Sequence, residues 1–131
     1  GDMVGHTGNL AATIRACEIT DRCLGEMIQR VNQIGGRYLV TADHGNADDM
    51  ALRDKNGNPK KDERGQILPR TAHSLNHVPL VFGGSDLASH IKLDPAVQTP
   101  GLANITATYL NLLGFQAPVS YEATLIHGDK K

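Results

Sequence analysis

The sequence lacks an excess of charge of either sign, and it lacks any long apolar run. Its 131 residues carry 13 basic and 14 acidic side chains, a formal net charge of -1. A protein that neutralises a nucleic-acid backbone needs a basic stripe, so this balance argues against a nucleic-acid partner. No apolar stretch approaches the roughly 20 residues of a membrane-spanning helix, and the first residues show no signal-peptide pattern. We therefore expect a small-molecule partner and no membrane association.

Cysteine is also scarce. Cys17 and Cys23 fall six residues apart inside one predicted helix, which puts them on different faces and argues against a disulfide between them. Reduced thiols are typical of cytosolic proteins, so we expect a cytoplasmic location. With 40% hydrophobic and 21% charged residues, the composition is that of one ordinary globular domain.

Two segments carry the period of an amphipathic helix. In residues 9–34 the apolar side chains recur at steps of three and four, with Asn9 as the candidate N-cap and Gly35 as the stop. A second helix is expected to start at Thr99 and Pro100 and to end at Gly114.

Two segments have the character of strands. Residues 37–41 are β-prone without alternation, which is typical of a strand buried on both faces of a parallel sheet. Residues 78–82 predict a second strand at a sheet margin, since Pro79 cannot donate a ladder hydrogen bond. Two strands are few beside the about five or six of a typical sheet, so we expect an α/β fold whose other strands lie elsewhere.

The stretch between these strands is polar. Residues 48–70 are dense in charge and contain Asn56-Gly57, Asn58-Pro59 and Gly65. We interpret them as a long solvated excursion with room for a hairpin. Such a loop is either a functional lid or a mobile surface loop without a function, and the sequence does not decide between these two alternatives.

Carboxylate and imidazole side chains gather in three short clusters, and these are ligand types of divalent cations. The clusters are Asp2 with His6, Asp43 with His44, and His73 alone. Asp43 and His44 follow the first predicted strand, and open α/β sheets bind ligands beyond the carboxyl ends of their strands. Together the five side chains suit one or two cations.

Each cluster also has a plain alternative. Asp2 and His6 are one helical step apart, but Gly5 and Gly8 disfavour a helix, so we expect both on a tight loop. Taken alone, that pair is a turn with a capping carboxylate, and His73 is a surface histidine. Three further histidines have no carboxylate near them and are expected on the surface or in loops: His77, His90 and His127.

Three motifs resemble, in order and separation, the phosphatase-domain motifs of the cofactor-independent phosphoglycerate mutases. They are GDMVGHTG at residues 1–8, TADHGN at 41–46 and TAH at 71–73, and the similarity continues to residue 126. The resemblance implies an alkaline-phosphatase-like three-layer α/β/α domain. Residues 1–131 would be its C-terminal, metal-binding portion, without the N-terminal strands.

The resemblance also implies the chemistry. Two divalent cations are expected, manganese first, with magnesium or cobalt as alternatives. Asp2, His6 and His73 would bind the metal that faces the substrate phosphate, and Asp43 and His44 would bind the other. The parent enzyme, expected to be a monomer, would interconvert 2- and 3-phosphoglycerate in glycolysis and gluconeogenesis through a phosphoserine intermediate.

The same resemblance puts the serine nucleophile, a further aspartate ligand and the substrate-binding domain upstream. The sequence opens at Gly1 inside a motif, so we expect a fragment that holds no catalytic residue, and Ser74 is no substitute. The isolated chain is therefore expected to be inactive. Two alternatives remain: a sibling enzyme such as phosphopentomutase or a metal-dependent phosphatase, against which the first and third motifs argue, and a non-catalytic metal-binding fragment.

Overall fold

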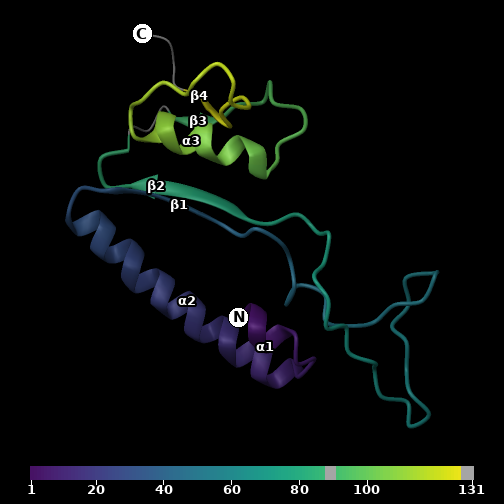
Figure 1. The fold of residues 1–131 in the computed structure, drawn as a ribbon. Coiled ribbons are helices and arrows are strands. Elements are labelled where there is room, and N and C mark those ends of the chain that lie inside the picture. Colours follow the sequence, from purple (N-terminus) through teal and green to yellow (C-terminus); the bar gives the residue numbers. More distant parts are fainter. Residues whose placement is uncertain (88–90, 128–131) are drawn as a thin grey trace. The chain divides into compact units, whose positions relative to one another are not determined.

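The computed structural model describes residues 1–87 and 91–127 (Figure 1). Its elements are, in chain order, α1 (Asp2–Gly5), α2 (Leu10–Gln33), β1 (Arg37–Thr41), β2 (Leu80–Gly84), β3 (Lys92–Leu93), a 3-10 turn η1 (Leu102–Asn104), α3 (Ile105–Leu112) and β4 (Ile126–His127). The chain divides into two compact units, which we call unit 1 (Gly1–Met27 with Thr41–Pro79) and unit 2 (Ile28–Val40 with Leu80–Lys131). Within the described residues, none of the helices has the length and apolar character needed to cross a membrane.

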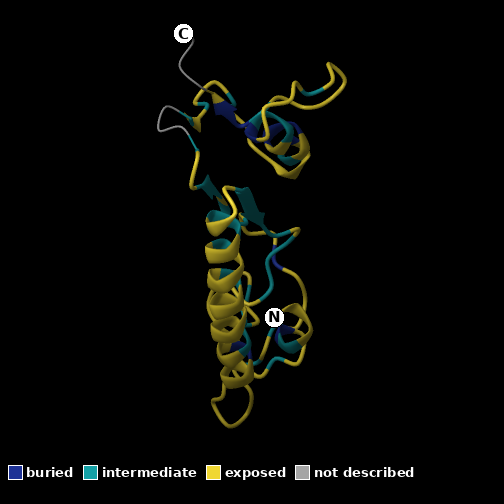
Figure 2. Ribbon diagram, turned by 90° about the vertical axis from the view of Figure 1, so that its left-hand side faces the viewer, coloured by how far each residue is buried: buried dark blue, intermediate teal, exposed yellow. Residues whose placement is uncertain are grey.

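Helix α2 begins and ends as the sequence predicts. The backbone amide of Ala12 donates to Asn9 Oδ1 at 3.0 Å, which caps the first turn. At the other end Gly35 takes a φ of 70°, and the amide of Gly36 donates to the Val31 carbonyl at 2.9 Å. Most of the helix is exposed, as Figure 2 shows, and Thr13 is its buried residue.

Asp2 and His6 do not lie on the loop that we predicted. Asp2 begins the short helix α1, and the amide of His6 donates to the Asp2 carbonyl at 3.0 Å. Gly5 is buried against Asn46, and a Cβ atom at Gly5 would collide with Asn46 Oδ1. Gly5 is therefore needed for close packing against Asn46, and a glycine with this role can lie in a helix. The chain takes a left-handed conformation only at Gly8, where φ is 69°.

Strands β1 and β2 form a two-stranded sheet, so both predicted strands are present, although the second spans Leu80–Gly84 rather than residues 78–82. Strand β2 starts at Leu80, directly after Pro79, as expected for a residue without an amide proton. At its end Gly84 lies against Gly36 and Arg37, where a Cβ atom would be 2.7 Å from the Gly36 carbonyl. The end of β2 thus lies beside the start of β1, which is the arrangement of an antiparallel pair, whereas we expected residues 37–41 to lie in a parallel sheet. The strands are half-exposed rather than buried on both faces.

The buried core of unit 2 centres on α3. Ala107 and Leu112 of this helix are 1% and 0% exposed, and Leu125 and Ile126 are buried with them. Strand β3 pairs with β4 in antiparallel register, Leu93 opposite Ile126. The buried Thr108 hydroxyl accepts a hydrogen bond from the Leu125 amide at 2.8 Å, so the helix and the segment before β4 are linked by a satisfied polar contact.

The helical segment starts later than predicted. We expected Thr99 to cap it, but the 3-10 turn begins at Leu102, where Asn104 Oδ1 accepts a hydrogen bond from the Gly101 amide at 2.9 Å. The Asn104 amide group also donates to the Ala123 carbonyl at 2.8 Å. This long-range contact fixes the start of the helix and cannot be read from the local sequence. The predicted end is confirmed, since Gly114 has a φ of 90°.

The excursion, residues 48–70, is held by a closed ring of backbone hydrogen bonds. Leu52 donates to Leu68 at 2.9 Å, Leu68 to Lys60 at 2.8 Å, and Lys60 to Leu52 at 2.7 Å. Two similar turns join the three segments, and in each an aspartate carboxylate, Asp54 or Asp62, accepts two backbone amides. Where we expected that the excursion could contain one hairpin, it contains two consecutive turns.

Candidate metal centre

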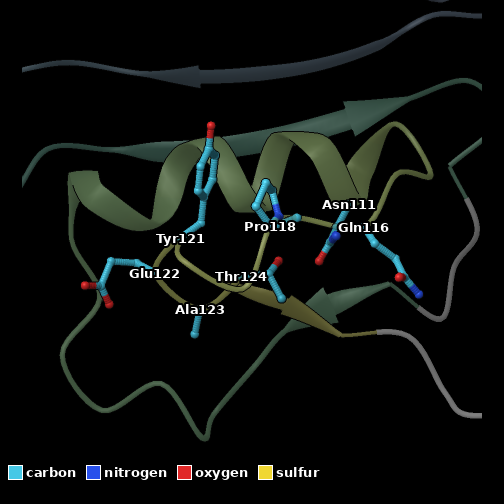
Figure 3. A pocket seen from close by; sticks show the side chains of 8 residues that line it. Asn111, Gln116, Pro118, Tyr121, Glu122, Ala123 and Thr124 are labelled. Atoms are coloured by element: carbon cyan, nitrogen blue, oxygen red, sulfur yellow. The ribbon is translucent and has the colours of Figure 1, made fainter.

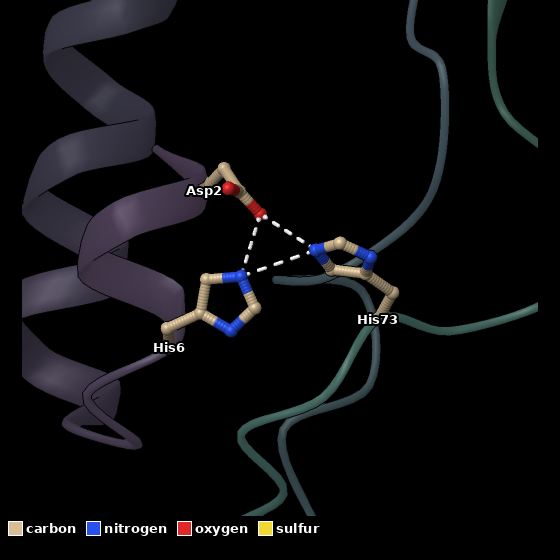
Figure 4. Close-up of side chains that lie close together, drawn as sticks. All are labelled: Asp2, His6 and His73. Atoms are coloured by element: carbon tan, nitrogen blue, oxygen red, sulfur yellow. Dashed lines mark hydrogen bonds and ion pairs between the residues drawn. The ribbon is translucent and has the colours of Figure 1, made fainter.

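The side chains of Asp2, His6 and His73 converge in unit 1 (Figure 4). Asp2 Oδ1 lies 3.3 Å from His6 Nε2 and 3.5 Å from His73 Nε2, and the two nitrogens are 3.1 Å apart. Helix α1 supplies Asp2, and His6 is the C-cap residue directly after it, since a single helical turn brings positions four apart onto one face. All three side chains are partly open to solvent, with 40 to 54% of their surface exposed.

These distances fit one divalent cation. Imidazole nitrogens and carboxylate oxygens lie about 2.0–2.2 Å from such ions. At tetrahedral or octahedral angles, neighbouring ligand atoms are then about 2.8–3.6 Å apart. The three separations fall within this interval, and one anionic oxygen with two neutral nitrogens is an ordinary donor set for zinc, manganese or cobalt.

The ring of His6 is oriented by the backbone. Its Nδ1 lies 2.5 Å from the Thr71 carbonyl oxygen, which can only accept a hydrogen bond. A neutral ring that donates this hydrogen bond from Nδ1 presents the lone pair of Nε2 toward Asp2 and His73. Metal-ligating histidines commonly have their other nitrogen fixed in this way.

Asp43 and His44 lie beside this cluster but do not belong to it. The ring of His44 stacks on that of His73, with centroids 3.5 Å apart and planes at 16°. Asp43 Oδ1 is 3.7 Å from His44 Nε2, and its side chain is 86% exposed. Among the described residues, Asp43 and His44 are not part of a group of three or more side chains whose ligand atoms converge. Their role as ligands of a second cation, like the role of the first three, stays a prediction.

The other histidines are separate from the site. His77 and His127 are exposed, as predicted for surface residues. His90 lies outside the described residues.

Sequence reasoning missed the contacts behind the ligands. Ser74, which follows His73, is only 4% exposed, and its hydroxyl donates to Asp48 at 2.7 Å. That hydrogen bond and a second one from Asn76 lower the pKa of Asp48. A serine directly after a candidate ligand was the available signal, but its partner is 26 residues away.

A hollow of about 340 Å³ lies in unit 2, between the end of α3 and the segment before β4 (Figure 3). Its lining is Asn111, Gln116, Ala117, Pro118, Tyr121, Glu122, Ala123 and Thr124. None of the five predicted ligands takes part, and Glu122 is its one charged side chain. The hollow is thus a feature separate from the metal centre.

The chain matches known proteins along nearly its whole length. It is 49% identical over 126 residues to a probable 2,3-bisphosphoglycerate-independent phosphoglycerate mutase 2 of Arabidopsis thaliana, and 51% identical to the corresponding enzyme of Zea mays. Each alignment covers 96% of this chain and 22% of the relative. A crystal structure of Leishmania mexicana phosphoglycerate mutase at low cobalt concentration matches with a TM-score of 0.95 and 50% identity. That match covers 98% of this chain and 24% of the crystallised one.

The predicted fold class is thereby confirmed: the described residues have the α/β arrangement of one part of a phosphoglycerate mutase. The chain spans about a quarter or less of the length of the relatives named above. A sequence model of the metalloenzyme superfamily matches residues 1–117, which include all five predicted ligands. On this match, the chain belongs to the metalloenzyme superfamily.

Proposed function

We propose that this chain is a metal-binding part of a 2,3-bisphosphoglycerate-independent phosphoglycerate mutase. Asp2, His6 and His73 bind one divalent cation, and Asp43 and His44 contribute to a second. The observation that carries the proposal is the convergence of one carboxylate oxygen and two imidazole nitrogens at separations of 3.1 to 3.5 Å. Relatives with about half of their matched residues identical are phosphoglycerate mutases, which supports the reaction class.

Each residue has a defined part in this function. Two cations bound here would neutralise negative charge on the oxygens of a transferring phosphoryl group. Asp2 supplies the anionic ligand, and the Thr71 carbonyl holds His6 with its Nε2 free. The stack of His44 on His73 sets the two rings in fixed relation, so the pair of sites is arranged before substrate arrives. Manganese is the preferred ion, with cobalt or magnesium as alternatives.

The reaction needs a positioned nucleophile as well as cations. Ser74 lies next to a ligand, but its hydroxyl is buried and donates to Asp48, so it is not free to attack a phosphate. We therefore assign no catalytic residue to this chain. The 131 residues alone bind metal without turning over 2- or 3-phosphoglycerate. The complete protein acts in glycolysis and gluconeogenesis as a cytoplasmic monomer, a location that the free thiols of Cys17 and Cys23 suit.

The complete protein tests the proposal directly. With manganese and 3-phosphoglycerate, it should form 2-phosphoglycerate, measured by coupling to enolase. Removal of metal with a chelator should abolish the activity, and added manganese should restore it. Activity that survives complete metal removal, or metal binding that is unaffected by His73→Ala, would contradict the proposal.

A further inference from the structure

Two adjacent carboxylates, Asp48 and Asp49, contact the segment that carries His73 by separate routes. The first route runs through Ser74. Asp48 accepts hydrogen bonds from the Ser74 hydroxyl at 2.7 Å and from the Asn76 amide group at 2.5 Å. Ser74 is 4% exposed, so its hydroxyl proton depends on this carboxylate as its acceptor.

A backbone hydrogen bond of Ser74 ties the segment of His73 to the segment of His44. The Ser74 amide donates to the Gly45 carbonyl at 2.8 Å, so the residues after the two histidines are paired. Gly45 has no room for a side chain, because a Cβ atom there would collide with Ser74 Oγ and lie 2.6 Å from Asp48 Oδ1. The glycine therefore lets the carboxylate approach the pair.

The second route runs through Arg70. The guanidinium of Arg70 donates to the His73 carbonyl at 2.9 Å and lies 3.6 Å from Asp49 Oδ2. Asp49 also accepts hydrogen bonds from Arg53, at 3.0 Å for the shortest, and its side chain is 14% exposed. The hydrogen bonds from Arg53, with the charge of Arg70 adding, lower the pKa of Asp49, so the carboxylate is held in its charged form.

We propose that Asp48 and Asp49 are positioning residues that hold His73 in place for metal binding, Asp48 through Ser74 and Asp49 through Arg70. Neither carboxylate is one of the three converging ligands, so both act through other residues. The inference rests on the metal-binding function proposed above. It gives the excursion a role, because its first and last segments, at Arg53 and Arg70, meet at Asp49.

The physical reason is the precision that a metal site requires. Ligand groups must be held to within about 0.5 Å, and partners behind the ligands typically change metal affinity by about 10- to 100-fold when removed. Without Asp48 the buried Ser74 hydroxyl loses its acceptor, and without Asp49 the charge that holds Arg70 against the His73 carbonyl is lost. In each case the segment of His73 loses one of its two supports, so its ligand nitrogen is held less precisely toward Asp2 and His6.

The test uses the complete protein with cobalt(II) as the probe, whose visible absorption reports the geometry of its ligands. Asp48→Ala and Asp49→Ala should each weaken cobalt binding by about 10- to 100-fold and change the absorption spectrum. The excursion offers matched controls in Asp54→Ala and Asp62→Ala. These carboxylates also accept two hydrogen bonds each, but from the backbone of their own turns. The controls should change cobalt affinity by less than about twofold.

Ser74→Ala removes the partner of Asp48, and Arg70→Ala removes the partner of Asp49. These two variants replace the aspartate variants if one of those does not fold. Combining Asp48→Ala with Ser74→Ala should cost no more affinity than Asp48→Ala alone, because both break one link. Wild-type affinity and spectrum in the variants of both routes would overturn the inference. Equal losses in Asp54→Ala and Asp62→Ala would also overturn it, since the effect would then be a general loosening of the excursion. His73→Ala separates the two proposals: if it alone loses cobalt, only this inference fails, and if it binds cobalt normally, the proposed metal site fails as well.

Discussion

His44 lies face to face with His73, with ring centroids 3.5 Å apart and planes at 16°. The excursion lies between them in the sequence, yet the pairing of Gly45 with Ser74 brings the two rings together. The stack joins two of the three predicted ligand clusters, so a displacement of one ring should also displace the other. His77, four residues after His73, is exposed and is not one of the three converging side chains.

The two histidines should therefore differ sharply when replaced in the complete protein. His73→Ala removes an imidazole from the converging set, and we expect turnover to fall by at least about a hundredfold, more than the loss of a residue behind a ligand. His77→Ala should change stability by no more than about 0.5 kcal/mol and leave turnover close to wild type. The measurement is 2-phosphoglycerate formation over a manganese series, in which high manganese should partly rescue His73→Ala. Equal activity of the two variants would show that His73 is wrongly assigned.

Local signals in the sequence predicted part of this arrangement. Helix α2 follows from its cap, its periodicity and its terminal glycine, and strand β1 follows from its β-prone residues. These signals act within a few residues. The interpretation of Gly5 failed because its role is set by Asn46, far along the chain. Asp48 was missed for the same reason, since its hydrogen bond with Ser74 joins residues 26 positions apart and forms only when the excursion folds. Contacts of long sequence separation decide these cases, and no local pattern records them.

The isolated 131-residue chain should show no mutase activity with 3-phosphoglycerate and added manganese. Ser74, the serine beside the predicted ligand His73, is buried and donates its hydroxyl hydrogen bond to Asp48, so it is not free to accept a phosphoryl group. An enolase-coupled assay measures the product directly, with the complete protein as the positive control. Formation of 2-phosphoglycerate by the isolated chain would contradict the proposal that it holds no nucleophile.

Acid should remove a contribution of Asp86 to the stability of unit 2. Arg37 donates to both carboxylate oxygens at 3.1 Å, and this hydrogen bonding lowers the pKa of Asp86 below its ordinary value of 3.8. A carboxyl whose pKa is lowered by folding stabilises the protein above its ordinary pKa, and the contribution is lost as the pH falls through the folded value. Asp86→Asn should therefore be less stable than wild type at pH 7, and the difference should shrink below about pH 4. Denaturant unfolding at several pH values and low salt measures this, and a difference independent of pH would exclude the ion pair as its cause.

Gly5→Ala tests whether the metal centre depends on the close packing of α1 against the segment after His44. Alanine is normally the better helix former by about 0.8–1.0 kcal/mol, so propensity alone predicts stabilisation. At Gly5, however, the added methyl group would collide with the Asn46 side chain, and overpacking of this kind typically costs about 1–3 kcal/mol. We expect the clash to win, with a lower melting temperature and weaker manganese binding, because the turn that carries Asp2 and His6 is displaced. Gly25→Ala is the matched control: it lies inside α2, a Cβ atom there meets nothing within 4 Å, and the variant should be as stable as wild type or more so with unchanged manganese affinity. If Gly5→Ala instead raised stability as Gly25→Ala does, the contact between Gly5 and Asn46 would have no role in holding the centre.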